Sequence, residues 1–375
     1  MEIDRRAFLA AAGGVAAQMA LPAWASTGQA ASLCYLGGRR LADGRFAVAI
    51  ADGQGRTIKT IPLPGRCHGF ARRPGTTEAV APARRPGSFC AVFDVADDVA
   101  EADYFQSARG RHFQGHGVFD PSGCTLFTTA NDYVRGRGVI GIYDATDGYR
   151  RIGEYASRGI GCHELVLLGD GKTVAVANGG ILTHPDSGRA KLNLPTMAPN
   201  LAYIDLADGH LLDRFQAADD RRRKLSIRHL AELADGRIAV ACQDEGAVGE
   251  GLPLVGLHRP GSGDGAFAVL QAPAAAWQAM AGYCGAVAVD PAGRLIAASA
   301  PRGDRILFWD GATGTPVGEL DLADGCGVAP GPAAGTFAAS SGTGAFVIGR
   351  PGAGSDGRPD RAGLPWDNHL LAVRA

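Results

Sequence analysis

The chain has 375 residues, with 37 lysines and arginines against 38 aspartates and glutamates, so its formal net charge is only −1. This balance gives no electrostatic footprint for nucleic acid or for an anionic membrane surface, and it argues against both as partners. The hydrophobic content of 46% is enough for a core, and 55 glycines predict many turns.

The first 25 residues predict an export signal. Arg5 and Arg6 precede an uncharged run over 7–25, which ends in the small-residue pattern Ala23-Trp24-Ala25. Paired arginines, an apolar stretch and an A-x-A pattern are typical of a twin-arginine signal peptide. A membrane-spanning helix needs about 20 strongly apolar residues, whereas this run is mostly alanine and includes proline. We therefore expect 1–25 to be cleaved, 26–375 to form one periplasmic domain exported in the folded state, and no membrane span to remain after cleavage.

The N-terminal part of the mature chain predicts three strands, at 33–36, 46–50 and 58–61. After them a short pattern recurs, in which an apolar strand is closed by a Gly, Pro or Asp turn. Copies begin at 68, 116, 163, 229, 286 and 328, at intervals of 48, 47, 66, 57 and 42 residues. Such spacing is close to the 40 to 50 residues of a four-stranded propeller blade, and no convincing helix lies between the copies.

The two ends of the chain predict how the propeller closes. The three N-terminal strands lack the first strand of a blade, and 369–373 supplies a strand of that type. Pairing them would complete a seventh blade and remove an open sheet edge. We expect an all-β fold, a single seven-bladed β-propeller closed by the C-terminal strand, with six or eight blades as alternatives.

Five of the nine histidines stand at the start of first strands, which line the central channel of a propeller. We expect them to face one another at one mouth of the channel: His68, His116, His163, His229 and His369. Imidazole is a common ligand of iron, copper, nickel and zinc, so the set is a candidate metal site. The alternative is a structural role, in which each ring is hydrogen-bonded to the neighbouring blade.

The turns after second strands open on the same face of a propeller. Polar residues collect there and form a candidate ligand-binding face: Arg84, Asn131, Asn178, His184, Gln243 and Arg302. Polar loop tips are also normal for any globular protein. The longest of these loops, 179–200, could cover the histidine mouth if it is ordered. We expect ordinary surface roles for His112, His210 and His258.

The remaining motifs exclude several kinds of chemistry. The eight cysteines form no C-x-x-C or C-x-x-C-H, so neither a structural zinc pair nor c-type haem is indicated, and we expect buried thiols rather than a disulfide framework. The chain has no Walker loop, nucleophile elbow, H-E-x-x-H or EF-hand loop. We therefore expect no nucleotide cofactor and assign no catalytic residue.

The N-terminal export signal and the short segments that contain the repeated histidines are together similar to those of a known family. Cys67-His68-Gly69, Gly115-His116-Gly117, Cys162-His163-Glu164 and the closing Trp366-Asp367-Asn368-His369 resemble the bacterial domain of unknown function family numbered 1513. The resemblance covers the mature chain. It implies a periplasmic seven-bladed propeller and a gene-neighbourhood link to imelysin-type iron-uptake proteins, which become the expected partners. It supports the importance of the five histidines without giving them a role.

These observations favour an accessory protein of iron (or copper) acquisition that binds a metal or metal complex at the histidine mouth. Twin-arginine export often serves proteins that fold around a cofactor. Two alternatives stay open: a periplasmic oxidoreductase with a redox centre on the axis, and a non-catalytic interaction scaffold with structural histidines. Whether any reaction is catalysed is left open at this point.

Overall fold

The protein is described by a computed structural model over residues 32–188, 190–217, 219–246, 250–263, 267–352, 358–359 and 363–374. The expected signal peptide and its cleavage point lie outside these residues. No helix in the described part of the chain has the length and apolar character needed to cross a membrane.

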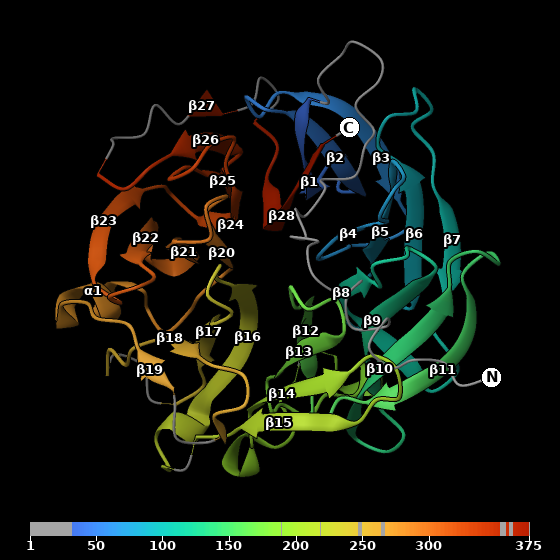
Figure 1. Cartoon of the computed structure of the whole chain (residues 1–375). Helices are drawn as coiled ribbons and strands as arrows, with labels where there is room; N and C mark the ends of the chain where they lie inside the picture. The colour runs from blue at the N-terminus through green and yellow to red at the C-terminus, as the bar shows by residue number, and fades with distance from the viewer. Residues whose placement is uncertain are drawn as a thin grey trace, which may run out of the picture. The chain divides into compact units, whose positions relative to one another are not determined.

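Seven four-stranded antiparallel sheets surround a central axis, which confirms the predicted seven-bladed β-propeller (Figure 1). Six of the blades are each built from four strands that follow one another in the chain. The first three of these blades are β4 (Ala71–Arg72), β5 (Glu78–Pro82), β6 (Phe89–Asp94) and β7 (Asp103–Gln106); β8 (Arg111–Phe119), β9 (Thr125–Asp132), β10 (Arg137–Asp144) and β11 (Arg150–Ala156); and β12 (Cys162–Leu167), β13 (Thr173–Asn178), β14 (Asn200–Asp205) and β15 (Leu211–Phe215). They are followed by β16 (Leu225–Glu232), β17 (Ile238–Asp244), β18 (Val255–His258) and β19 (Ala268–Val269); β20 (Val287–Val289), β21 (Leu295–Ala300), β22 (Arg305–Asp310) and β23 (Pro316–Asp321); β24 (Gly325–Pro330), β25 (Phe337–Ser341), β26 (Ala345–Gly349) and β27 (Arg358–Pro359).

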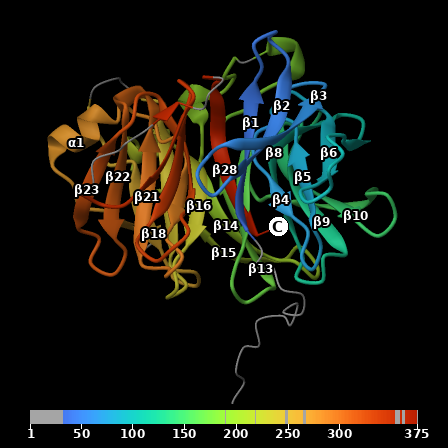
Figure 2. The same cartoon turned by 90° about the horizontal axis from the view of Figure 1, so that it is seen from above.

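The seventh blade joins the two ends of the described chain. It consists of β28 (Trp366–Arg374), β1 (Leu33–Arg40), β2 (Phe46–Asp52) and β3 (Thr57–Leu63), in that order from the axis outward. Strand β28 runs antiparallel to β1, with Leu36 opposite Leu371, and the two strands lie side by side in the perpendicular view (Figure 2). The closure predicted from the sequence is therefore confirmed, and β1 is not left as an open edge.

Short helices lie in several loops of the described part of the chain. One α-helix of the described chain, α1 (Ala274–Ala279), lies between β19 and β20, where the sequence analysis expected no helix. Its alanines are good helix formers, and its Trp277 is buried against the propeller core. Among the described residues, 3₁₀ helices are formed by η1 (Pro185–Ser187), η2 (Leu194–Thr196), η3 (Arg222–Lys224) and η5 (Pro301–Gly303).

Hydrophobic clusters fill the spaces between adjacent blades, because the strands bury apolar side chains on both faces. All eight cysteines are free; seven are buried among such side chains and Cys124 is exposed. The seven buried cysteines pack as small hydrophobic residues, as expected, whereas the exposed Cys124 departs from that expectation.

Among the described residues, Trp309 is the largest completely buried side chain, and it anchors one of these clusters. Its ring stacks on Trp277 with centroids 5.8 Å apart, and its indole N–H donates to the carbonyl of Gln271 at 2.7 Å. Trp309→Ala is expected to lower the free energy of unfolding by about 3–5 kcal/mol, since it leaves a cavity and an unpaired carbonyl. Denaturant unfolding measures this, with the exposed Ile58→Ala as control; equal small losses in both variants would contradict the assignment.

Candidate metal site at the channel mouth

The five predicted histidines meet at the axis of the propeller. His369 lies among the others, with ring centroids 4.4 Å from His68, 4.6 Å from His229 and 4.8 Å from His116. His163 joins the group 4.9 Å from His229 and 5.3 Å from His68. We call these five side chains the histidine cluster. They come from five different blades, so only the closed ring brings them together.

Breaks in the strand ladders point these rings at one another. The pairing of β8 with β9 is irregular between Phe113 and Gly117, where His116 lies. The pairing of β12 with β13 shifts between Cys162 and Glu164, and His163 occupies that shift. A β-bulge adds a residue without a ladder partner and changes the direction of its side chain. Each bulge therefore lets a residue leave the regular alternation and reach the axis.

The histidines do not all occupy one repeat position, which corrects the sequence analysis. Glu164 and His229 are the equivalent residues, since each resumes the ladder directly after the shift, opposite Ala177 and Ala241. His163 stands one residue earlier, where the next blade has Arg228. The two consecutive residues His163 and Glu164 both reach the cluster because the bulge interrupts the alternation of faces.

Glu164 is the functional candidate that the sequence analysis missed. Its carboxylate accepts from Nδ1 of His229 at 3.0 Å and from the Leu230 N–H at 3.1 Å, and it lies 3.4 Å from Nδ1 of His116. A carboxylate that holds the Nδ1–H of an imidazole leaves Nε2 with a lone pair for a ligand. The sequence did contain a signal for this residue. When the blades are aligned on the glycines of their turns, Glu164 falls at the position that His229 occupies in the next blade.

Burial keeps the histidine cluster neutral. Desolvation lowers the pKa of His116 to about 4 and that of His229 to about 3, and it holds the pKa values of the other three rings well below the usual range. The nearby guanidinium groups of Arg84 and Arg228 act in the same direction. Burial raises the pKa of Glu164. At pH 7 the imidazoles therefore offer lone pairs rather than positive charges.

Four of the rings present nitrogen atoms in a small volume. One ligand atom each from His68, His116, His163 and His369 lies within 4.8 Å of all the others. Metal–imidazole distances of about 2.0–2.1 Å place two opposite nitrogens at most about 4.2 Å apart. A small contraction would therefore fit the set to an ion. Two buried atoms, Nδ1 of His68 and Nε2 of His116, have no hydrogen-bond partner, and such atoms are uncommon unless something else satisfies them.

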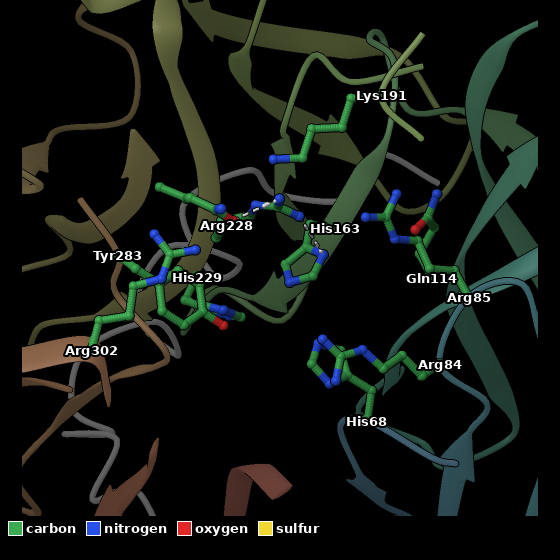
Figure 3. A pocket seen from close by; sticks show the side chains of 11 residues that line it. His68, Arg84, Arg85, Gln114, His163, Lys191, Arg228, His229, Tyr283 and Arg302 are labelled. Carbon is green, nitrogen blue, oxygen red and sulfur yellow. Dashed lines mark hydrogen bonds between the residues drawn. The ribbon is translucent and has the colours of Figure 1, made fainter. Parts of the chain in front are cut away.

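A cavity of about 340 Å³ adjoins the cluster. Three cluster residues contribute to its wall, and five cationic side chains surround it from several blades (Figure 3). We call it the cationic cavity; its lining is His68, His163, His229, Arg84, Arg85, Lys191, Arg228, Arg302, Gln114, Gln243 and Tyr283. Arg84, Gln243 and Arg302 of the predicted ligand-binding face are among these residues, and Lys191 comes from the long loop.

Comparisons with known proteins identify the family and support the fold. Residues 61–373 match the family model described as Protein of unknown function (DUF1513).

The chain belongs to the DUF1513 family.

No curated protein matches it. Among solved structures, the hydrazine synthase of Kuenenia stuttgartiensis is similar, with a TM-score of 0.60 and 13% sequence identity over 82% of this chain and 90% of that one. At this identity the likeness shows a shared fold and no more.

Three predicted residues of the ligand-binding face lie elsewhere in this DUF1513 protein. The Asn131 side chain donates to the carbonyl of Thr183 at 3.1 Å, and that of Asn178 donates to the carbonyl of Ser157 at 2.7 Å. His184 accepts from the Asp186 N–H at 3.3 Å at the start of η1. None of the three contributes to the lining of the cationic cavity. Their polar atoms stabilise loops, because backbone groups there lack ladder partners.

Two histidines outside the cluster are buried, which corrects the expected surface roles. The His112 ring contacts the Phe113 carbonyl at 3.0 Å and the Asn131 amide at 3.2 Å. The His258 ring is hydrogen-bonded to the Tyr203 hydroxyl at 2.8 Å. These partners lie up to 55 residues away in the sequence, so no local pattern indicates them. His210 is exposed, as expected.

The metal-free DUF1513 protein is expected to lose stability as the pH falls below about 6.5. A histidine whose pKa is lowered by folding stabilises the folded state above its unfolded value of 6.5, and this contribution disappears as the pH falls toward the folded value, about 4 for His116. Glu164 acts in the opposite direction, since its pKa is raised. Urea unfolding between pH 7.5 and 5 measures the effect, and His116→Ala is expected to reduce the slope. A midpoint that does not change with pH would contradict the buried neutral cluster.

Proposed function

We propose that this DUF1513 protein binds one transition-metal ion in the histidine cluster. The observation that carries the proposal is the convergence of four imidazole nitrogens within 4.8 Å of one another, two of the buried ring nitrogens being without a hydrogen-bond partner. His68, His116, His163 and His369 would be the ligands. His229 and Glu164 would position the set, since Glu164 contacts Nδ1 of both His116 and His229.

The nitrogen donors of the cluster favour a transition metal over magnesium or calcium. Neutral imidazole suits iron, copper, zinc and nickel, whereas magnesium and calcium prefer oxygen ligands. Among these metals we propose iron or copper, carried by a protein of metal acquisition. The twin-arginine leader and the family resemblance support this setting, with the periplasm as the compartment and an imelysin-type uptake protein as the partner.

A structural role alone is a weaker account of the cluster. Structural imidazoles at blade contacts would pair their nitrogens with backbone groups of the neighbouring blade. In this cluster the rings instead face other rings and the Glu164 carboxylate, and His68 and His369 bring their Nε2 atoms 3.3 Å apart. Five buried neutral rings also oppose folding at low pH, as argued above, so the arrangement costs stability. A ligand bound only by the folded state would offset that cost.

Elemental analysis of protein purified from the periplasm of an overproducing cell tests the proposal. The expected result is about one iron or copper atom per chain that survives gel filtration. Metal-free protein, made by dialysis against a chelator, should then recover one ion when iron(II), copper or zinc salts are added singly. Trace metal in the native protein together with no uptake of any of the three ions would remove the proposal.

A further inference from the structure

The lining of the cationic cavity has an unusual charge composition. It contains Arg84, Arg85, Lys191, Arg228 and Arg302, and no carboxylate. The whole chain has nearly equal numbers of acids and bases, so five cations around one cavity of about 340 Å³ are a local concentration of charge rather than a general property of the surface.

Two carboxylates lie close to these cations. Asp367 pairs with Arg84 at 3.6 Å, and it also forms an ion pair with Arg66. Glu245 pairs with Arg228 at 3.7 Å, and it also forms an ion pair with Lys191. Each of the two carboxylates is thus shared between two cations. Both lie behind the wall and are nearly buried, so the cavity itself presents positive charge.

The other polar groups fix the directions of these cations. Arg228 donates to the Gln243 amide oxygen at 2.9 Å, and Arg302 lies over the Tyr283 ring at 5.0 Å and donates to the carbonyl of Ala281. Tyr283 in turn accepts from the Asn368 amide at 2.6 Å. Planar guanidinium groups held in this way match the bidentate geometry of carboxylates and phosphates.

The same charges act on a metal ion in the adjoining cluster. Neutral imidazoles supply no negative charge, so a bare divalent ion would lie beside five cations with Glu164 as the only carboxylate in contact with the described cluster. Like charges in a partly dehydrated site repel by more than they do in water. An anion in the cationic cavity would remove this conflict, since it would face the guanidinium groups on one side and the ion on the other.

We infer that the cationic cavity binds a small oxyanion of at least two negative charges, placed beside the histidine cluster. The chemical class is a polycarboxylate or a phosphate. The inference deepens the proposed metal site, because such an anion can enter with the metal as its chelate or bind by itself. The cations alone are sufficient for the second route, so anion binding does not depend on the metal.

Calorimetric titration of metal-free protein with citrate, and separately with inorganic phosphate, tests the inference. We expect at least one of the two anions to bind with 1:1 stoichiometry and an affinity that falls as salt is added. The double variant Arg85→Gln, Arg302→Gln is expected to weaken it by 10-fold or more. The control Arg45→Gln, on the exposed turn between β1 and β2, is expected to bind like the parent. Unfolding midpoints of all three proteins establish that they are folded.

A second experiment distinguishes an anion that enters with the metal as its chelate from one that binds by itself. In it, the metal-loaded protein is titrated with the same anions. Tighter citrate binding to the loaded protein than to the metal-free one would assign a metal chelate, whereas equal phosphate binding to both would assign a free anion. Anion binding by a protein that takes up no metal would uphold the cavity and reject only the metal site. Failure of citrate and phosphate to bind either form, or equal binding by parent and double variant, would overturn the inference.

Discussion

The double variant His116→Ala, His163→Ala is expected to lose its metal, from about one ion per chain to less than about a tenth. The two changes remove half of the four ligands within 4.8 Å, and the remaining nitrogens of His68 and His369 are too few to hold an ion against solvent. Elemental analysis of parent and variant after identical purification measures the change.

Two control variants test whether metal is lost because the site is changed, rather than because any histidine or any buried side chain is removed. His210→Ala removes an exposed histidine, and His112→Ala removes a buried one outside the cluster. Both are expected to keep the metal of the parent. Equal and substoichiometric metal in the parent and in the double variant would remove the metal site, and the account would then reduce to a propeller with structural histidines.

Glu164→Gln is expected to weaken metal binding by roughly 10- to 100-fold, the range found when the carboxylate partner of a ligating histidine is lost. The carboxylate can accept from Nδ1–H of both His116 and His229, whereas the amide has one accepting oxygen and turns an N–H toward one of the rings. That ring must rotate or change tautomer, so its Nε2 is no longer presented with a lone pair.

The affinity is measured by competition with a chromophoric chelator, and the unfolding midpoint of the metal-free protein is measured beside it. Glu232→Gln is the control, because Glu232 lies on β16, the strand that carries His229, and accepts from the Gly169 N–H at 2.7 Å, away from the cluster. A positioning role predicts weaker metal binding only in Glu164→Gln. Equal affinities in the two variants, with loss of stability in both, would indicate that Glu164 is structural.

The fold was predictable because it depends on local signals that repeat. The turn pattern sets the blade spacing, and the missing first strand of the N-terminal group pairs with 369–373, as the register of β1 with β28 shows. Residues 1–31 lie outside the described part of the chain, so the signal peptide stays a prediction. The helix α1 was missed because six residues are too few for a periodic pattern to stand out.

The site was predictable only in part, since strand irregularities have no clear signature in a single sequence. The histidines were found by their place in the repeat, yet the bulge that puts His163 and Glu164 together was not. Asn131 and Asn178 were assigned to the open face because they end second strands. Their side chains instead turn inward, to Thr183 and Ser157, through loop contacts that no local pattern encodes.

The central claim is that one metal ion is held by imidazoles from several blades. X-ray absorption spectroscopy of the metal-loaded protein, at the edge of the bound metal, tests this most directly. The account predicts a first shell with three or four nitrogen scatterers near 2.0–2.2 Å and the outer-shell pattern of imidazole rings. A first shell of oxygen or sulfur atoms without imidazole features would contradict it, because the ion would then be bound outside the histidine cluster.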